Sequence, residues 1–272
     1  MPFLECFGLT KRFGSISIFK ELELSVDDNR ILIAGPNGLG KSTLIKLIYG
    51  LQRPNEGFLK IMGLDPSRNE DRIRKDISYL PAEPSFPPYY RISDLYDFAA
   101  SFASFNTIEK LERELGIIGL RDRYPRFLSS GEKQILSIVI AFSMKKKAFL
   151  LDEAISSVDP TRRRRIIKMI SEFKGGLIIT THEMTELVSV TDSVLKVFRS
   201  SNGDRSLFEV RNALELPILV SSRNLQRHRE ELIASGIECL MEGPLIKSNG
   251  HVRGIMDVIG DDLLFAKRDF NE

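Results

Sequence analysis

The chain has 272 residues, of which 42% are hydrophobic and 28% are charged, and its formal net charge is +2. These values are ordinary for a globular protein with one large domain and a small one. The small net charge argues against a nucleic-acid binder or a strongly basic membrane-binding surface.

The sequence contains no recognisable targeting or membrane-spanning segment. Its first residues lack the basic and long apolar regions of a signal peptide, and no apolar run approaches the roughly 20 residues that span a bilayer. The two cysteines, Cys6 and Cys239, are far apart, which disfavours a disulfide framework and favours a reducing compartment. We therefore expect a soluble protein that can dock on a membrane-bound partner.

Residues 3–34 predict β-structure. Residues 3–9 and 16–26 alternate apolar and polar side chains, as half-buried antiparallel strands do. Phe13 lies between them, where it can stack on a flat ligand such as adenine, although an aromatic there is more often a core or turn side chain. Residues 31–34 form an apolar run that predicts a buried strand.

A glycine-rich loop follows that run, with the sequence Gly-Pro-Asn-Gly-Leu-Gly-Lys-Ser-Thr at residues 35–43. A helical pattern follows at residues 41–49, and strand, loop and helix together predict a phosphate-binding loop. The glycines let successive backbone N–H groups point inward, and the helix adds the positive end of its dipole. Lys41 would reach the β- and γ-phosphates, and the Ser42 hydroxyl would ligate Mg²⁺.

The middle of the chain predicts two short strands and a small helical insert. Residues 57–63 and 77–80 are the strands, and the four prolines within residues 81–88 exclude regular structure there. Residues 92–120 show helical periodicity, and either Ser93 or Asp94 is a suitable helix cap. The side chains expected to point inward are Leu95, Phe98, Phe102, Leu111 and Leu115.

Two further segments carry polar residues at the ends of apolar elements. The sequence Leu-Ser-Ser-Gly-Glu at residues 128–132 enters an apolar helix at 135–144, and this entrance either accepts an anion or is only a helix cap. The buried strand at 148–153 ends in Asp152 and Glu153, which are either solvated surface or, beside a phosphate loop, a Mg²⁺ ligand and a general base.

The remaining elements complete an alternating β–α pattern. A helix at 161–173 carries four arginines at 162–165, for which a solvated helix face is the ordinary explanation. The buried strand at 177–181 ends at His182, which is either structural or a contact for a γ-phosphate. After a strand at 194–198, residues 206–272 predict a small α+β appendage without a catalytic constellation.

Over residues 3–200 these segments resemble the nucleotide-binding subunit of an ABC transporter, because six motifs occur in the family's order. In chain order these are the A-loop aromatic Phe13, the Walker A motif at 35–43, the signature at 128–132, the Walker B motif with its glutamate at 149–153, the D-loop at 156–159 and the H-loop residue His182. The resemblance implies an α/β fold with a P-loop (RecA-like) core, an N-terminal antiparallel β subdomain and a short α-helical subdomain at about residues 90–132. It places the ATPase domain at residues 1–200 and leaves 206–272 as an accessory domain.

The resemblance also implies an ATPase that uses ATP and Mg²⁺. Two subunits, identical or different, would close head to tail, with each ATP between Walker A of one and Ser129 and Gly131 of the other. Glu153 would activate water, His182 would steady the γ-phosphate, and Asp159 would communicate across the interface. The implied nucleotide-binding residues are Phe13, Gly35, Asn37, Gly38, Gly40, Lys41, Ser42, Thr43, Ser129 and Gly131, with Ser42 and Asp152 at the metal and Lys41, Glu153 and His182 in catalysis.

Two departures from the family pattern affect these expectations. The family places a glutamine, the Q-loop residue, after residues 80–81, where this chain has Ala82 followed by Glu83. Either Glu83 substitutes for it or the coupling to the membrane subunit is altered. In the signature, Ser130 replaces a glycine and Glu132 replaces a glutamine, but Ser129 and Gly131 are kept, so we expect an active signature.

The expected partner is a permease on a separate membrane-embedded chain, with this subunit cytoplasmic and peripheral on the inner face of the cell membrane. No nucleic-acid partner is expected. Residues 79–85, the short insert and the appendage resemble ATPases of ABC-2-type exporters, which favours export. The alternatives are a soluble ABC-type ATPase acting on ribosomes or nucleic acid, and a nucleotide-binding regulatory module with little turnover.

Overall fold

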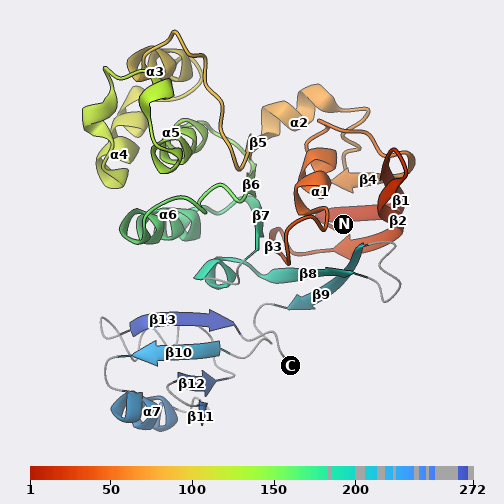
Figure 1. Cartoon of the computed structure of the whole chain (residues 1–272), viewed down its shortest axis with the longest axis vertical. Coiled ribbons are helices and arrows are strands. Elements are labelled where there is room, and N and C mark those ends of the chain that lie inside the picture. Colours follow the sequence, from red (N-terminus) through yellow and green to blue (C-terminus); the bar gives the residue numbers. More distant parts are fainter. Residues whose placement is uncertain are drawn as a thin grey trace.

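A six-stranded sheet forms the centre of the protein (Figure 1). The structure is a computed structural model that describes residues 1–182, 186–199, 206–212, 218–222, 225–235, 239–242, 245–248 and 263–268. The strand order is β5-β6-β7-β3-β8-β9, with parallel pairing except between β8 and β9. The strands are β3 (Arg30–Ala34), β5 (Ile77–Leu80), β6 (Ala148–Asp152), β7 (Gly176–Thr181), β8 (Ser193–Arg199) and β9 (Ser206–Asn212).

Alternate residues of the central strands enter two separate hydrophobic cores. Along β3, Leu32 and Ala34 belong to one core, whereas Ile31 and Ile33 belong to the other. Side chains of a strand point alternately to its two faces, so a sheet covered on both sides needs an unbroken apolar run. The apolar runs in the sequence predicted these buried strands, and the α/β fold is confirmed.

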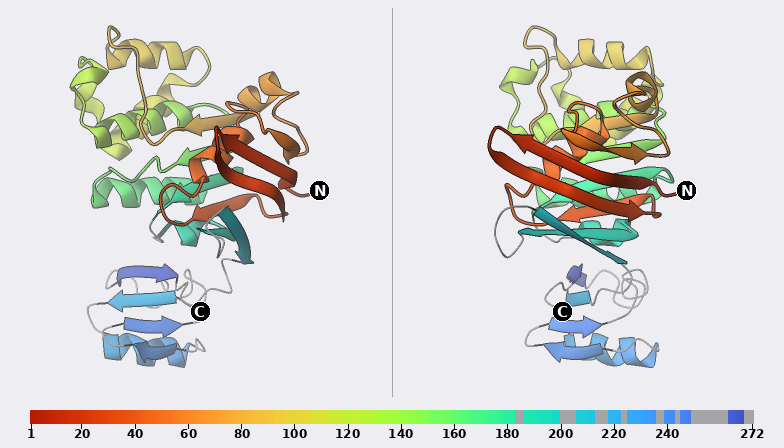
Figure 2. Two further views of the ribbon diagram at one scale, coloured as in Figure 1. Left: turned by 45° about the vertical axis from the view of Figure 1, so that its right-hand side comes forward. Right: turned by 90° about the vertical axis from the view of Figure 1, so that its right-hand side faces the viewer.

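One face of this sheet is covered by helix α1 (Lys41–Ile48) and by a three-stranded antiparallel sheet (Figure 2). The order of that sheet is β2-β1-β4, formed by β1 (Leu4–Phe13), β2 (Ile16–Val26) and β4 (Glu56–Ile61). Its strands alternate buried and exposed positions over part of their length, as predicted. Helix α2 (Glu70–Asp76), which the sequence reading did not predict, follows on this side and buries only Ile73.

The other face carries the helical part of the chain. Helices α5 (Ser130–Ser143) and α6 (Pro160–Glu172) pack on it, with α3 (Ile92–Ala100) and α4 (Phe105–Leu115) beyond α5 (Figure 1). The short 3₁₀ turns are η1 (Ile118–Leu120), η2 (Pro125–Phe127) and η3 (Glu186–Val190). None of the helices that the structure describes is both long and apolar enough to cross a membrane.

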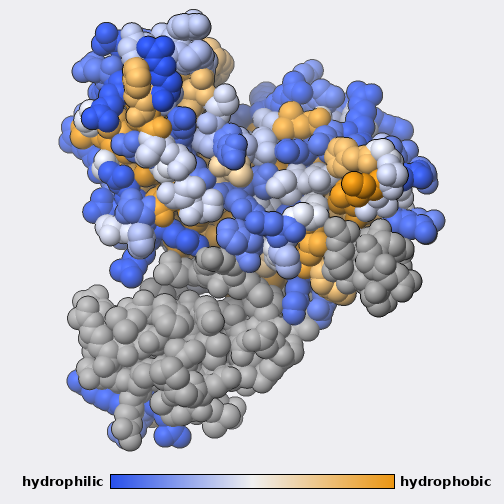
Figure 3. All heavy atoms as spheres, in the orientation of Figure 1, coloured by the Kyte–Doolittle hydropathy of each residue, from blue (hydrophilic) through white to orange (hydrophobic). Residues whose placement is uncertain are grey.

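Two of the predicted inward positions are wrong. Leu111 and Leu115 are buried and Leu95 packs against the core, but Phe98 and Phe102 are 67% and 65% exposed and stack edge-on against each other. Figure 3 shows hydrophobic atoms at the surface over this helical region. Helical periodicity identifies apolar side chains on one face of a helix. It does not show which part of that face another element covers, and here Phe98 and Phe102 stay uncovered in the described structure.

The N-cap of α3 is Arg91, so neither Ser93 nor Asp94 occupies the capping position, and Asp94 contributes from the first turn instead. The helix begins after Arg91, and the Asp94 carboxylate accepts a hydrogen bond from the Arg91 backbone N–H at 2.7 Å. A carboxylate in the first turn satisfies a backbone donor that the helix itself cannot satisfy, and it complements the helix dipole.

The four arginines of α6 are not simply a solvated face. Arg162 donates to the carbonyl of Gly116 at 2.9 Å, and Arg165 donates to the carbonyl of Glu114 at 2.9 Å. These carbonyls lie at the C-terminal end of α4, where the last carbonyls of a helix lack partners within it. The two guanidinium groups therefore tie α6 to the end of α4.

The C-terminal part of the chain forms a second, four-stranded sheet of order β11-β12-β10-β13, with helix α7 (Leu225–Ala234) beside it (Figure 1). Its strands are β10 (Ile218–Ser222), β11 (Cys239–Glu242), β12 (Leu245–Ser248) and β13 (Leu263–Arg268). Strand β9, which falls inside the predicted appendage of 206–272, pairs along its length with β8 of the central sheet. The division into domains at 1–200 and 206–272 stays a prediction.

Cys6 supplies a pH-dependent prediction. Burial, with a smaller effect of Glu23, raises the pKa of the Cys6 thiol from 9.0 to about 12. Only the thiolate reacts with iodoacetamide, so native Cys6 at pH 8 should react at least about a thousand times more slowly than in urea. Between pH 9 and 12 the unfolded state loses this proton before the folded state does, so stability should fall with rising pH. Peptide-level mass spectrometry distinguishes Cys6 from Cys239 and therefore measures the alkylation rate of Cys6 in buffer and in urea. Equal rates in buffer and urea would contradict the first expectation.

Candidate functional site

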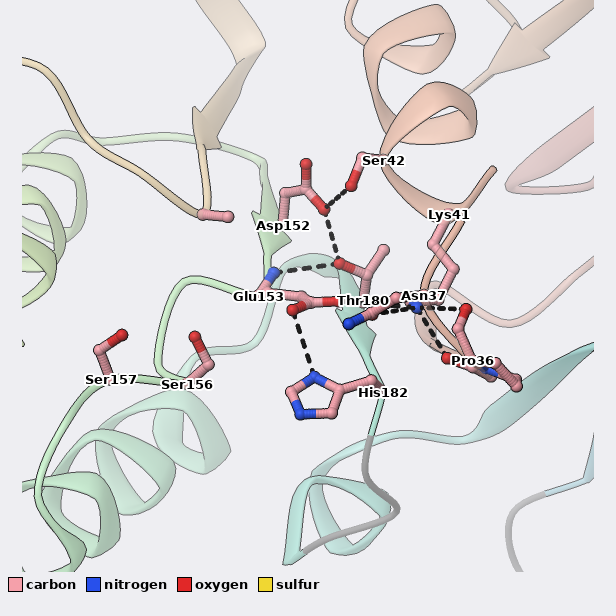
Figure 4. A network of polar contacts seen from close by, with 12 residues as sticks. Pro36, Asn37, Lys41, Ser42, Asp152, Glu153, Ser156, Ser157, Thr180 and His182 are labelled. Carbon is pink, nitrogen blue, oxygen red and sulfur yellow. Dashed lines mark hydrogen bonds and ion pairs between the residues drawn. The ribbon is translucent and has the colours of Figure 1, made fainter. Parts of the chain in front are cut away.

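Three neighbouring strands of the central sheet end at the same edge and bring the polar side chains together. Asp152 of β6 lies beside Thr180 of β7, and Thr181 lies beside Ala34 of β3. The next residues along the chain are therefore adjacent as well: the loop starting at Gly35, Glu153 and His182 (Figure 4). Carboxyl ends of parallel strands are where α/β proteins bind ligands.

The loop at 35–40 has the backbone conformation that only glycine adopts easily. Gly38 and Gly40 have φ of 78° and 90°, in the left-handed region. A Cβ on Gly40 would lie 2.4 Å from Cγ2 of Ile18, so the close packing against β2 also requires glycine. No side chain caps helix α1, which begins at Lys41, and its first N–H groups face the loop as an anion-binding helix start.

Lys41 is buried within this loop. Its Nζ donates to the carbonyls of Gly35 at 2.7 Å and Pro36 at 2.9 Å and lies 3.4 Å from Oδ1 of Asn37. It also lies 3.6 Å from Oε1 of Glu153. Desolvation lowers the Lys41 pKa, and the nearby Glu153 carboxylate opposes that shift. The amine is thus held by three oxygens of the loop together with the nearby carboxylate of Glu153.

Asp152 is the buried centre of a second set of contacts. One carboxylate oxygen accepts from Ser42 Oγ and from Thr180 Oγ1, both at 2.8 Å. The hydroxyl of Tyr79 lies 3.5 Å from the other oxygen, and burial together with Asp152 raises the Tyr79 pKa. The structure therefore brings together Ser42 and Asp152, the two residues expected at the metal.

The Ser42–Asp152 pair has the chemistry of a Mg²⁺ site. Mg²⁺ prefers oxygen ligands and is usually held by one or two protein groups together with substrate phosphates and water. A hydroxyl and a carboxylate that share a hydrogen bond beside a phosphate-type loop fit this set. No cluster of three or more His, Cys, Asp or Glu side chains suited to a metal exists in the described part of the chain.

Glu153 stands between Lys41 and His182. One oxygen faces Lys41 and the other lies 3.2 Å from Nδ1 of His182, while the Glu153 backbone N–H donates to Thr180 Oγ1 at 3.0 Å (Figure 4). Its φ is 50°, one of three positive values among non-glycine residues of the described chain. Strained backbone of this kind is held by its surroundings and is common at functional sites. In this conformation the Glu153 carboxylate points toward the amine of Lys41.

The signature segment lies on the opposite face of the sheet from α1. Ser129 caps α5: Glu132 N donates to Ser129 Oγ at 3.2 Å, and the Glu132 carboxylate accepts from Ser129 N at 2.8 Å and Oγ at 2.9 Å. The hydrogen bond from the Ser129 backbone is the main reason that the Glu132 pKa is lowered. Within the described chain, no hydrogen bond or ion pair joins Ser129 or Gly131 to the loop at 35–43.

Three more residues named in the sequence analysis make no hydrogen bond or ion pair with this centre in the described part of the chain. Phe13 is 45% exposed at the end of β1, so it is not a core side chain, and Lys11 Nζ lies 4.9 Å from its ring centroid. Thr43 lies in the first turn of α1. Asp159 caps α6 by accepting from Arg162 N at 3.0 Å.

Sequence reasoning missed Gln134 and Thr180. Gln134 is 2% exposed, and its amide contacts the backbone of Ala82, Glu153 and Ser157. The sequence carries little signal for Gln134, because it is the last of five polar or glycine residues before the apolar run of α5; only its burial shows that the amide needs partners. Glu83, the suggested substitute for the Q-loop glutamine, is exposed and makes no hydrogen bond or ion pair that the described residues reveal.

Comparisons with known proteins agree with this geometry. A family model described as "ABC transporter" matches residues 19–156. A protein of Archaeoglobus fulgidus named as an ABC transporter ATP-binding protein is 34% identical over 188 residues, covering 66% of this chain and 79% of that protein. The aliphatic sulfonates import ATP-binding protein SsuB of Zymomonas mobilis is 28% identical over 205 residues, covering 73% and 84%.

Other relatives are longer. The chain covers 58% of the Fe(3+) ions import ATP-binding protein FbpC of Escherichia coli K12, with which it is 28% identical. Among solved structures, an ATP-binding subunit of an ABC transporter superposes with a TM-score of 0.67 at 23% identity, over 86% of this chain and 95% of that one. CbiO1 from Clostridium perfringens, described as part of the complex cbiONQ, gives 0.61 at 21%, over 79% and 90%. At these identities the structures show a shared fold.

Proposed function

Because the chain belongs to the ABC transporter ATP-binding family, whose members are ATPases coupled to transport, we propose that two copies of a cassette close around two ATP molecules and drive a separate membrane permease. The observation that carries this proposal is the cluster at the sheet edge, where Lys41, Ser42, Asp152, Glu153 and His182 meet through distances of 2.8–3.6 Å. The second cassette is either the same chain or a related one.

The phosphates are held by the backbone of the loop and by the start of α1. The Lys41 amine would exchange the loop carbonyls of Gly35 and Pro36 for β- and γ-phosphate oxygens, which are stronger acceptors because they are charged. Ser42 and Asp152 would hold Mg²⁺, which offsets phosphate charge. The exposed ring of Phe13 would stack on adenine, a role that its position at a strand end allows.

Glu153 acts as the general base in the proposed hydrolysis. Its carboxylate takes a proton from a water that attacks the γ-phosphorus, and the bond to the β-phosphate oxygen breaks to give ADP and inorganic phosphate. His182 Nδ1 lies within hydrogen-bond distance of this carboxylate, so it orients the base besides any contact with the γ-phosphate. Lys41 stabilises the charge on the transferring phosphoryl group.

The second half of each site comes from Ser129 and Gly131 of the other cassette. In the described chain these residues lie apart from the loop at 35–43, so one copy does not complete the site on its own. Glu132 occupies the capping position that glutamine has in the family and makes both hydrogen bonds of a capping box. The substitution therefore keeps the helix start intact.

The permease interaction places this subunit on the cytoplasmic face of the cell membrane. The exposed aromatic side chains of the helical region, Phe98 and Phe102, offer an apolar contact for such a partner. The export direction stays a prediction, and the relatives SsuB and FbpC, which are named as import proteins, do not support it. The proposed roles of the site residues are the same for import and for export.

Affinity purification of the full chain from its native membranes tests the partner. The proposal predicts recovery of a polytopic membrane protein in stoichiometric amount, and faster ATP turnover in the detergent-solubilised complex than in the isolated chain. Recovery of ribosomes instead, with no membrane protein, would favour the soluble ATPase. Binding of ATP without measurable turnover in the complex would favour the regulatory module.

A further inference from the structure

One buried side-chain amide connects the segment after β5 with the segment after β6. Gln134 lies in the second turn of α5 and is 2% exposed. Its Nε2 donates to the carbonyl of Ala82 at 3.0 Å and lies 3.4 Å from the carbonyl of Glu153. Its Oε1 accepts from the backbone N–H of Ser157 at 3.0 Å. The amide thus contacts three points of backbone that are distant in sequence.

Only an amide of this length satisfies these partners. Two are carbonyls that need a donor, and one is an N–H that needs an acceptor. A glutamate has no donor when ionised, a lysine has no acceptor, and an apolar side chain satisfies none of them. The neighbouring Ile135 and Leu136 are buried apolar residues, so filling this space does not by itself require a polar group.

The three connected segments have different positions relative to the proposed site of ATP hydrolysis. Ala82 lies in the proline-containing stretch that leads from β5 of the central sheet to α3 of the helical region. Glu153 carries the carboxylate that faces Lys41 and His182. Ser157 lies in the loop from Glu153 to α6, and Figure 4 shows its side chain with that of Ser156 on the far side of Glu153 from Lys41.

A second contact from the same helix supports the connection. A Cβ on Gly131 would lie 2.6 Å from the carbonyl of Ser157, so α5 packs directly on the backbone of that loop. The start of α5 therefore touches the loop after Glu153 twice, through the packing of Gly131 and through the hydrogen bond of Gln134. A shift of α5 relative to the sheet cannot leave residues 153–157 unchanged.

We propose that Gln134 is a positioning residue that makes the loop at 153–157, and with it the carboxylate of Glu153, follow movements of the segment at Ala82. This inference rests on the proposed function of Glu153. The link uses the carbonyl of Ala82 and not its side chain. It therefore operates although the glutamine that the family has at this position is replaced by alanine.

The test begins with Gln134→Met, which keeps the approximate volume and removes every hydrogen bond. Hydrogen–deuterium exchange of the nucleotide-free protein should show the Ser157 amide exchanging at least tenfold faster than in the wild type. ATP turnover should fall about tenfold in kcat, with KM for ATP within twofold, because Gln134 does not contact the loop at 35–43. The matched control is Ser143→Ala, which removes a buried hydrogen bond from Ser143 Oγ to Ile140 O in the same helix and should leave both readouts unchanged.

Gln134→Glu separates the two halves of the link. Its ionised carboxylate retains an acceptor for the Ser157 N–H but loses the donor to Ala82, whereas the protonated carboxyl keeps both and replaces the amide. A profile of kcat against pH should therefore fall as this carboxyl ionises, while Ser157 protection remains. A pH profile of kcat in Gln134→Glu identical to that of the wild type, or a kcat within twofold of wild type in Gln134→Met, would overturn the proposal. Because the exchange measurement needs no nucleotide, wild-type protein without ATPase activity would refute the proposed function and would leave the exchange test of the hydrogen bonds readable.

Discussion

Replacing Glu153 by Gln is expected to lower ATP turnover by at least about a hundredfold, because general-base catalysis typically contributes 10²–10⁴-fold. The amide has nearly the same shape, so the hydrogen bond from the Glu153 backbone to Thr180 and the fold should remain. Glutamine cannot take a proton from water at neutral pH. ATP affinity should stay within a few-fold of wild type, since the phosphates are held by the loop at 35–43.

Steady-state phosphate release with and without Mg²⁺ measures this effect. The matched control is Glu132→Gln, which makes the same chemical change at the start of α5, where glutamine also supports a capping box. Its turnover should remain within about threefold of wild type, as expected for a change that keeps the cap. Hydrolysis at the normal rate in Glu153→Gln would show that this carboxylate is not the base.

Replacing Lys41 by Ala is expected to weaken ATP binding and to abolish turnover. The amine is the buried cation of the loop at 35–43, and a charge-assisted hydrogen bond to phosphate is roughly twice as strong as a neutral one. Its removal also leaves Glu153 without its nearby cation, so the site becomes more negative where phosphate charge must be bound. We expect at least a tenfold loss in affinity, about 1.4 kcal/mol.

Titration with a fluorescent ATP analogue measures the affinity. Lys46→Ala is the control, because Lys46 lies in the last turn of the same helix and makes the same change in net charge. That variant should bind nucleotide as the wild type does. Equal ATP affinity in the Lys41→Ala variant and the wild type would contradict the assignment of the phosphate site.

Much of the central fold could be predicted from the sequence because the signals are local. The runs at residues 31–34, 148–153 and 177–181 are short, apolar and bounded by turn residues, which indicates strands buried on both faces. The glycine pattern at 35–40 reflects backbone angles and close packing that other residues resist. The assignment of these segments to one site came from the order of the six motifs, which matches the order in the family. No single segment contains that information.

The misses depend on contacts between distant segments. Phe98 and Phe102 have the helical spacing of core residues, but no other element covers them in the described structure. Arg162 and Arg165 form a charged run that looks solvated until the end of α4 lies beside it. Gln134 reads as a polar residue at a helix start, and its three backbone partners lie 19–52 residues away.

The mass of the Glu153→Gln protein with bound nucleotide tests the central claim most directly. In the proposed function, the loop at 35–43 is half of a site that a second cassette completes. With ATP and Mg²⁺, light scattering should therefore give twice the monomer mass of 30.9 kDa, and with ADP it should give the monomer. Adding Ser129→Arg should restore the monomer with ATP by placing a bulky side chain at the predicted interface. The result that would contradict the proposal is a protein that binds ATP but stays monomeric under all these conditions. It would have to stay monomeric both alone and when mixed with a related cassette that serves the same permease.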